Sequence, residues 1–266
     1  MRKRRSHFTF SALAFGYAFL YIPLVSVIVY SFNDSRLATV WGGFSARWYG
    51  ELLRNEQVLD AAFLSLRIAV VTATLATILG TMAGMALARF GRFRGRTLFS
   101  GMITSPLVMP EVITGLSLLL LFVSLHQLVG WPAQRGFSTI TIAHTTFALA
   151  YVTVIVQSRL VAMDESLEEA AMDLGGRPLR VVFDITLPLI APAMIAGWLL
   201  AFTLSLDDLV IASFVSGPGG STLPMLIFSK IRLGVTPDIN ALATLIIAVV
   251  SVGVLIAWWI GQRSRR

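Results

Sequence analysis

Six long apolar segments are the feature that most constrains the fold of this chain of 266 residues. They lie at residues 10–32, 60–88, 99–125, 138–162, 189–215 and 239–261. A helix needs about 20 mostly apolar residues to cross about 30 Å of hydrocarbon, and each segment is long enough. A helix also satisfies its own backbone hydrogen bonds in lipid. The sequence therefore predicts an all-α polytopic membrane protein with six transmembrane helices.

The composition supports a membrane protein and argues against other classes. Hydrophobic residues make up 56% of the chain, charged residues 13%, and the mean hydropathy is +0.79, which is far from the balance of a soluble domain. The absence of cysteine excludes disulfides, thiolate metal sites and cysteine nucleophiles. The net charge of +7 comes from short basic runs between apolar segments, so we expect no nucleic-acid partner.

The basic residues predict the orientation, because cytoplasmic flanks retain positive charge during insertion. Fourteen of the 21 lie on one set of alternate flanks: Arg2, Lys3, Arg4, Arg5, Arg89, Arg92, Arg94, Arg96, Arg159, Arg177, Arg180, Arg263, Arg265 and Arg266. The opposite flanks hold Arg36, Arg47, Arg54, Arg135, Lys230 and Arg232, with Arg67 within or near the second segment. We therefore expect both termini to be cytoplasmic.

A polar segment on the predicted cytoplasmic side has the pattern of a short helix. Ser166-Leu-Glu-Glu169 is typical of a capping box, and Gly175-Gly176 followed by Pro178 is typical of a helix end. Apolar residues recur at helical spacing between these signals, at Leu167, Ala170, Ala171 and Leu174.

The narrow apolar face of this helix suits a groove in a partner protein, because its alanines permit close approach. An amphipathic helix lying on the inner leaflet is the alternative. Helices of that kind normally carry Lys or Arg on the polar face, whereas this one is acidic, which favours protein docking.

Three acids lie inside the apolar segments, where charge is costly and each acid is a functional hypothesis by default. At about 1.5 Å per residue, Glu111 is expected near the midplane of the third segment, and Asp207 and Asp208 in the outer half of the fifth. Pro106 and Pro110 precede Glu111 and would free backbone carbonyls. Carboxylates and carbonyls together predict a path for a cation.

The two aspartates are expected to face different surfaces, since adjacent helical residues point about 100° apart. Asp208 shares a small and polar stripe with Ala201, Ser205 and Ala212, which favours Asp208 and Ser205 as path residues. An ion pair, a helix-terminus contact or a protonated carboxyl in the core is the alternative role for each acid.

Enzyme motifs are missing from the sequence. Neither Lys3 nor Lys230 follows a Gly-rich phosphate loop, so the energy of an ATP-driven process must come from another polypeptide. The three histidines are scattered, and no H-E-x-x-H or G-x-S-x-G occurs. We expect no catalytic residue, metal or cofactor, and we interpret His144 as a hydrogen-bonded packing residue.

Small residues predict one close helix contact. Gly80 and Gly84 form a G-x-x-x-G pattern in the second segment, with Ala73, Thr77 and Ala88 nearby. Such patterns let membrane helices approach closely.

The polar segment also resembles the signature of permease subunits of bacterial ABC importers: E-A-A, three residues, G, nine residues, then I-x-L-P. The resemblance implies a type I importer permease fold as one transmembrane domain over residues 1–266, with a coupling loop at 163–188 that binds an ATPase. The residues that the signature assigns to coupling are Glu169, Ala170, Ala171, Gly175, Ile185, Leu187 and Pro188.

Three other stretches resemble polyamine importer permeases of the putrescine type: residues 40–54, 106–117 and 201–218. Relatives usually have Asp where this chain has Glu111, which keeps the charge but changes its reach. The resemblance implies a bacterial inner-membrane subunit that pairs with a homologous permease, two ATP-binding subunits and a periplasmic solute-binding protein.

Two other functions stay open at this point. One is an importer permease for another solute, such as spermidine, another cation or a neutral molecule, because fold similarity does not determine a ligand. The other is a secondary transporter or cation channel, which the intramembrane acids alone would permit. The E-A-A segment argues against the second.

Overall fold

The computed structural model describes residues 7–35, 40–234 and 236–263. Within those ranges the chain is helical, and its only extended pairing is an isolated antiparallel bridge between Asn33 and Phe44. Seven residues used to predict the orientation lie outside the described ranges: Arg2, Lys3, Arg4, Arg5, Arg36, Arg265 and Arg266.

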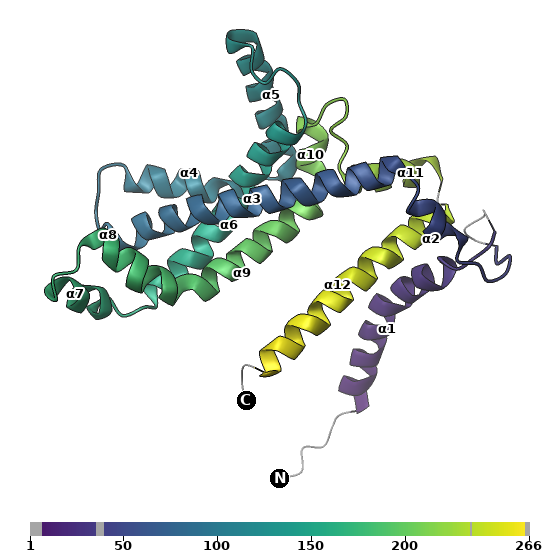
Figure 1. The fold of residues 1–266 in the computed structure, drawn as a ribbon, viewed down its shortest axis with the longest axis horizontal. Helices are drawn as coiled ribbons and strands as arrows, with labels where there is room; N and C mark the ends of the chain where they lie inside the picture. The colour runs from purple at the N-terminus through teal and green to yellow at the C-terminus, as the bar shows by residue number, and fades with distance from the viewer. Residues whose placement is uncertain (1–6, 36–39, 235, 264–266) are drawn as a thin grey trace. The chain divides into compact units, whose positions relative to one another are not determined.

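The helices follow the apolar segments, which confirms the predicted all-α membrane fold (Figure 1). In chain order they are α1 His7–Tyr30, α2 Arg47–Leu52, α3 Glu56–Arg89, α4 Arg96–Val108, α5 Glu111–Val129, α6 Phe137–Val161, α7 Ser166–Asp173, α8 Pro178–Val181, the π-helical turn η1 Val182–Thr186, α9 Leu187–Leu206, α10 Val210–Val215, α11 Leu223–Leu233 and α12 Pro237–Arg263. Among the described residues, five helical stretches are long and apolar enough to cross a membrane, and α12 adds a shorter apolar stretch, Pro237–Val252.

The chain divides into two compact units. One comprises residues 1–59 and 227–266, where α12 packs against α1 and α2. The other comprises residues 60–226, where α6 packs against α9, α4 and α10, and α10 packs against α5. Of the five candidate spans α6 is the most enclosed, with 67% of its apolar window buried, so α6 forms the centre of this second unit.

The predicted close packing at the G-x-x-x-G pattern is confirmed. A Cβ atom at Gly80 would lie 2.8 Å from Cβ and Cγ1 of Val152 on α6. A Cβ atom at Gly84 would lie 3.2 Å from the backbone nitrogen of Gln157. The missing side chains therefore bring α3 against α6 at a distance that no larger residue allows without a shift.

The third apolar segment is not one continuous helix, which corrects the prediction for residues 99–125. The chain leaves the helical conformation at Met109, with φ −78° and ψ 136°, and α5 begins after Pro110. Proline lacks the N–H group and disfavours helical geometry in the residue before it, which explains the break. Glu111 is therefore the first residue of α5 and does not lie within a continuous third helix.

The fifth segment also differs from the expected helix at 189–215. A continuous helical stretch runs from Pro178 to Leu206, so it begins earlier than expected and ends before the two aspartates. No proline or glycine lies at this break. Instead the Asp208 carboxylate accepts hydrogen bonds from the backbone amides of Ile211 at 3.4 Å and Ala212 at 2.7 Å, which starts α10 afresh.

Candidate functional site

The helix α7 carries the E-A-A residues, and its N-terminus differs from the predicted capping box. The helix begins at Ser166, and no side-chain hydrogen bond caps its N-cap position, Glu165. The Asp164 carboxylate instead accepts the Ser166 backbone N–H at 3.0 Å. Hydrogen bonds from the Ser166 backbone and side chain lower the pKa of Asp164. The start of α7 is thus stabilised by the residue two positions before it.

The C-terminus of α7 ends as predicted, at the glycine pair. The Gly176 N–H donates to the Ala171 carbonyl at 3.0 Å, and the Gly175 N–H donates to the Met172 carbonyl at 2.9 Å. Gly175 has φ +88°, the left-handed conformation that glycine adopts at little cost. Together these bonds form a Schellman motif, which satisfies carbonyls at the end of the helix.

The apolar face predicted for α7 is left uncovered by the chain itself. Leu174 is 90% exposed and Leu167 is 48% exposed, and Ala170 is exposed beside them. Glu169 is exposed as well. On the following segment Leu179 is 76% exposed. Apolar groups exposed this far are typical of a surface that another protein or lipid covers.

Five of the seven signature residues fall into two groups in the structure. Ala171, Gly175 and Ile185 line one open hollow of about 640 Å³, whose wall also includes Arg177 and Arg180.

The other members of the I-x-L-P motif lie at the start of α9. Leu187 packs against the buried core, and Pro188 lies in the first turn of the helix. The structure therefore brings the E-A-A helix end and Ile185 together, and it places Leu187 and Pro188 at the start of α9.

Sequence reasoning missed one charged network at this segment. Arg89, the last residue of α3, places Nε 2.7 Å from Glu168 Oε2 and Nη1 3.0 Å from Glu165 Oε1. The other oxygen of Glu168 accepts the Thr186 hydroxyl at 2.6 Å. The sequence holds adjacent Glu168 and Glu169, and the tertiary contacts of Glu168 with Arg89 and Thr186 distinguish them.

The second candidate group, near the break after α9, forms a closed cluster. His144 Nδ1 lies 2.8 Å from Ser205 Oγ, and His144 Nε2 lies 3.1 Å from Asp208 Oδ1. The His144 and Asp208 side chains are 2% and 8% exposed, and their surroundings leave essentially no cavity. Each ring nitrogen of His144 therefore has a polar partner. His144 is therefore a hydrogen-bonded buried residue, as predicted.

The remaining acids lie outside this cluster. Asp207 is exposed directly after α9, and Glu111 is exposed at the start of α5. Among the described residues neither forms an ion pair. The two aspartates therefore differ in surroundings, because the helix breaks between them and only Asp208 turns to His144.

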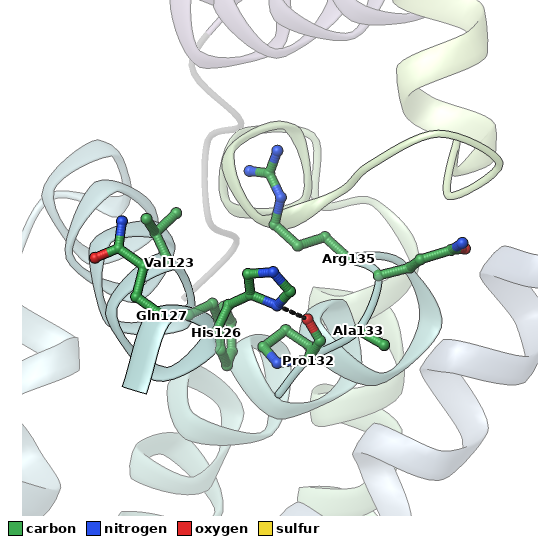
Figure 2. A pocket seen from close by; sticks show the side chains of 8 residues that line it. Val123, His126, Gln127, Pro132, Ala133 and Arg135 are labelled. Carbon is green, nitrogen blue, oxygen red and sulfur yellow. Dashed lines mark hydrogen bonds between the residues drawn. The ribbon is translucent and has the colours of Figure 1, made fainter. Parts of the chain in front are cut away.

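A further hollow of about 240 Å³ lies beside the end of α5. Figure 2 shows the His126 ring turned to the Pro132 carbonyl oxygen, 2.9 Å from Nδ1. None of the candidate site residues lines this hollow, and its polar groups do not converge on one point.

A multi-pass helical membrane fold with an exposed E-A-A helix defines a transport permease. The model of the family described as "binding-protein-dependent transport system inner membrane component" matches residues 76–266, and the chain belongs to this family. It is therefore a multi-pass inner-membrane protein.

Curated relatives agree with this assignment along nearly the whole chain. The putrescine transport system permease protein PotI of Escherichia coli K12 is 61% identical over 98% of this chain and 93% of the relative. The spermidine/putrescine transport system permease protein PotC of Haemophilus influenzae is 46% identical over 87% of each chain.

Solved structures share the fold at low identity. A chain of a bacterial ABC transporter that imports alginate has a TM-score of 0.71 at 16% identity and covers 99% of this chain and 98% of that chain. A chain of the MetNI methionine ABC transporter has a TM-score of 0.62 at 15% identity, with 80% and 95% covered.

Proposed function

We propose that this chain is a permease subunit of an ATP-driven importer whose substrate is putrescine. The exposed α7 helix carries the proposal of an ATP-driven system, because the chain leaves its apolar face open. The name of the 61% identical relative supports putrescine. In this proposal the whole chain works as one transmembrane domain, and residues 163–188 form the coupling loop.

The partners follow from the same assignment. A homologous but distinct permease would complete the path, and two ATP-binding subunits would dock on the coupling loops. A periplasmic solute-binding protein would deliver the substrate. In this arrangement both termini and α7 lie in the cytoplasm, on the side that the basic flanks favour. Docking of the loaded binding protein would favour closure of the ATPase pair, which opens the path outward, and hydrolysis would reset it.

The signature residues would have two different roles in this docking. Glu169, Ala170, Ala171, Gly175 and Ile185 would contact the ATPase or shape the hollow that receives it. Leu187 and Pro188 would transmit the movement by anchoring the start of α9.

For the substrate path we propose Asp207 and Glu111 as the carboxylates that meet the diamine. Both are exposed in the single chain, and carboxylates offset the cost of removing water from two ammonium groups. Asp208 and Ser205 would not contact the diamine. They would act indirectly, by holding the break after α9 in place through their contacts with His144. Binding must stay weak enough for release.

The first test is uptake of labelled putrescine by cells that express this chain with its partner permease, ATPase and binding protein. Uptake that depends on this chain and is weakly inhibited by unlabelled spermidine is the expected result. Strong inhibition by spermidine would favour the second candidate substrate, which the names of the PotC relatives suggest. An assembled, ATP-hydrolysing complex without putrescine uptake would overturn the substrate assignment.

Transport without ATP is the alternative mechanism, and the coupling helix decides between the two. Deleting residues 166–176 should abolish both ATPase association and uptake. If uptake survives the deletion with no ATPase bound, the chain works as a secondary transporter or channel.

A further inference from the structure

The base of α7 is bound to its own chain by a charged network. The Arg89 guanidinium reaches Glu168 at 2.7 Å and Glu165 at 3.0 Å, and Thr186 donates to Glu168 at 2.6 Å. The side chains of Arg89 and Glu168 are 15% and 14% exposed, whereas that of Glu165 is 64% exposed. The pair of Arg89 and Glu168 is therefore the enclosed part of the network.

Together with Thr186, this pair joins three separate elements of the chain. Arg89 ends α3, Glu168 lies in the first turn of α7, and Thr186 ends the π-helical turn before α9. Separating an enclosed ion pair leaves an uncompensated charge away from water, which is strongly unfavourable. The start of α7 thus cannot tilt away from α3 without breaking charged hydrogen bonds.

We propose that Arg89 and Glu168 are positioning residues that make α7 and the end of α3 move together when the ATPases close. The inference rests on the proposed function, since it assumes that α7 receives the ATPase movement. Adjacent glutamates then have separate tasks: Glu169 is exposed and available to a partner, while Glu168 bonds to its own chain. α3 then responds directly to the movement of α7.

The test uses the complete complex reconstituted in liposomes, with the binding protein on the side from which putrescine is taken up. Putrescine uptake and ATP hydrolysis are measured on the same liposomes and compared. Glu168→Gln and Arg89→Gln each remove one charge, and the double variant Arg89→Glu with Glu168→Arg restores the pair in reverse. Thr186→Val removes only the hydroxyl donor. Arg92→Gln is the matched control, because Arg92 is exposed and makes no ion pair among the described residues.

We expect each single charge variant to lower uptake per ATP hydrolysed by about fivefold or more, the low end of the usual range for coupling between sites. The reversed pair should recover most of this loss, and Arg92→Gln should behave as wild type. Wild-type coupling in the single variants overturns the proposal, and so does a reversed pair that assembles but couples no better than they do.

If the charge variants fail to assemble, Thr186→Val decides: reduced uptake per ATP supports the proposal, and wild-type coupling overturns it. Failure of the proposed function is recognised separately. In that case the wild-type complex takes up no putrescine. The variants can then still be compared with the wild type by how strongly the binding protein stimulates their ATP hydrolysis.

Discussion

Val152 on α6 lies directly against Gly80 on α3, where an added Cβ would be 2.8 Å from the Cβ and Cγ1 atoms of Val152. Val152 also meets Gly197 of α9, where an added Cβ would be 3.2 Å from Cγ1. Val152 is fully buried. One β-branched side chain therefore fills the space that two glycines leave open, and it holds three helices at a short distance.

The first prediction concerns this contact. Gly80→Ala should destabilise the purified chain by about 1–3 kcal/mol, because overpacking forces Val152 or the helices to shift. The measurement is thermal unfolding in detergent. Gly101→Ala is the control, since Gly101 is also helical and has no atom within 4 Å of an added Cβ. Equal melting temperatures for the two variants would contradict the packing described above.

The second prediction concerns the end of α7. Gly175 has φ +88°, so Gly175→Ala should strain the Schellman motif by about 1–2 kcal/mol. Gly175→Asn should cost less, because asparagine tolerates the left-handed conformation. Co-purification of the ATPase with each variant measures the effect, and we expect weaker association for alanine than for asparagine. The reverse order would show that side-chain contact, not backbone conformation, governs this position.

The third prediction separates the two aspartates. Asp207→Asn should lower putrescine uptake while the melting temperature stays unchanged, because Asp207 is exposed. Asp208→Ala should lower the melting temperature, because it removes the oxygens that bond to His144 and to the first turn of α10. Replacement by Ala of a side chain that accepts the first N–H groups of a helix typically costs about 1 kcal/mol. Wild-type uptake with Asp207→Asn would remove this residue from the path.

The fourth prediction concerns orientation. The chain has no cysteine, so a single introduced thiol reports its own position without background. Arg92→Cys and Ser221→Cys place exposed thiols in the connections between α3 and α4 and between α10 and α11. A membrane-impermeant maleimide applied outside the cell should label position 221 and not position 92. Labelling of position 92 alone would reverse the proposed topology.

Features that depend on local chemistry could be predicted from the sequence. The apolar segments are helices because a single chain segment satisfies its own hydrogen bonds. Gly175 ends α7 because its conformation is local. Gly80 and Gly84 predicted a close contact because a helix surface without a side chain lets any neighbouring helix approach closely.

Features that depend on tertiary contacts could not be predicted from the sequence. The capping box failed because Asp164, rather than the Ser166 side chain, stabilises the start of α7, while Arg89 holds the neighbouring Glu168. The break after Leu206 has no proline or glycine signal, and the Asp208 carboxylate that starts α10 afresh also contacts His144, 64 residues away. The different surroundings of Asp207 and Asp208 follow from that contact.

The self-contained ends of α7 have a consequence for the thermodynamics of assembly. The helix is fixed at its start by Asp164 and at its end by Gly175 and Gly176, before any partner is present. A segment that folds only on contact loses conformational entropy at that moment, which weakens the complex. α7 is ordered in advance, so the apolar area that it presents can contribute more fully to affinity.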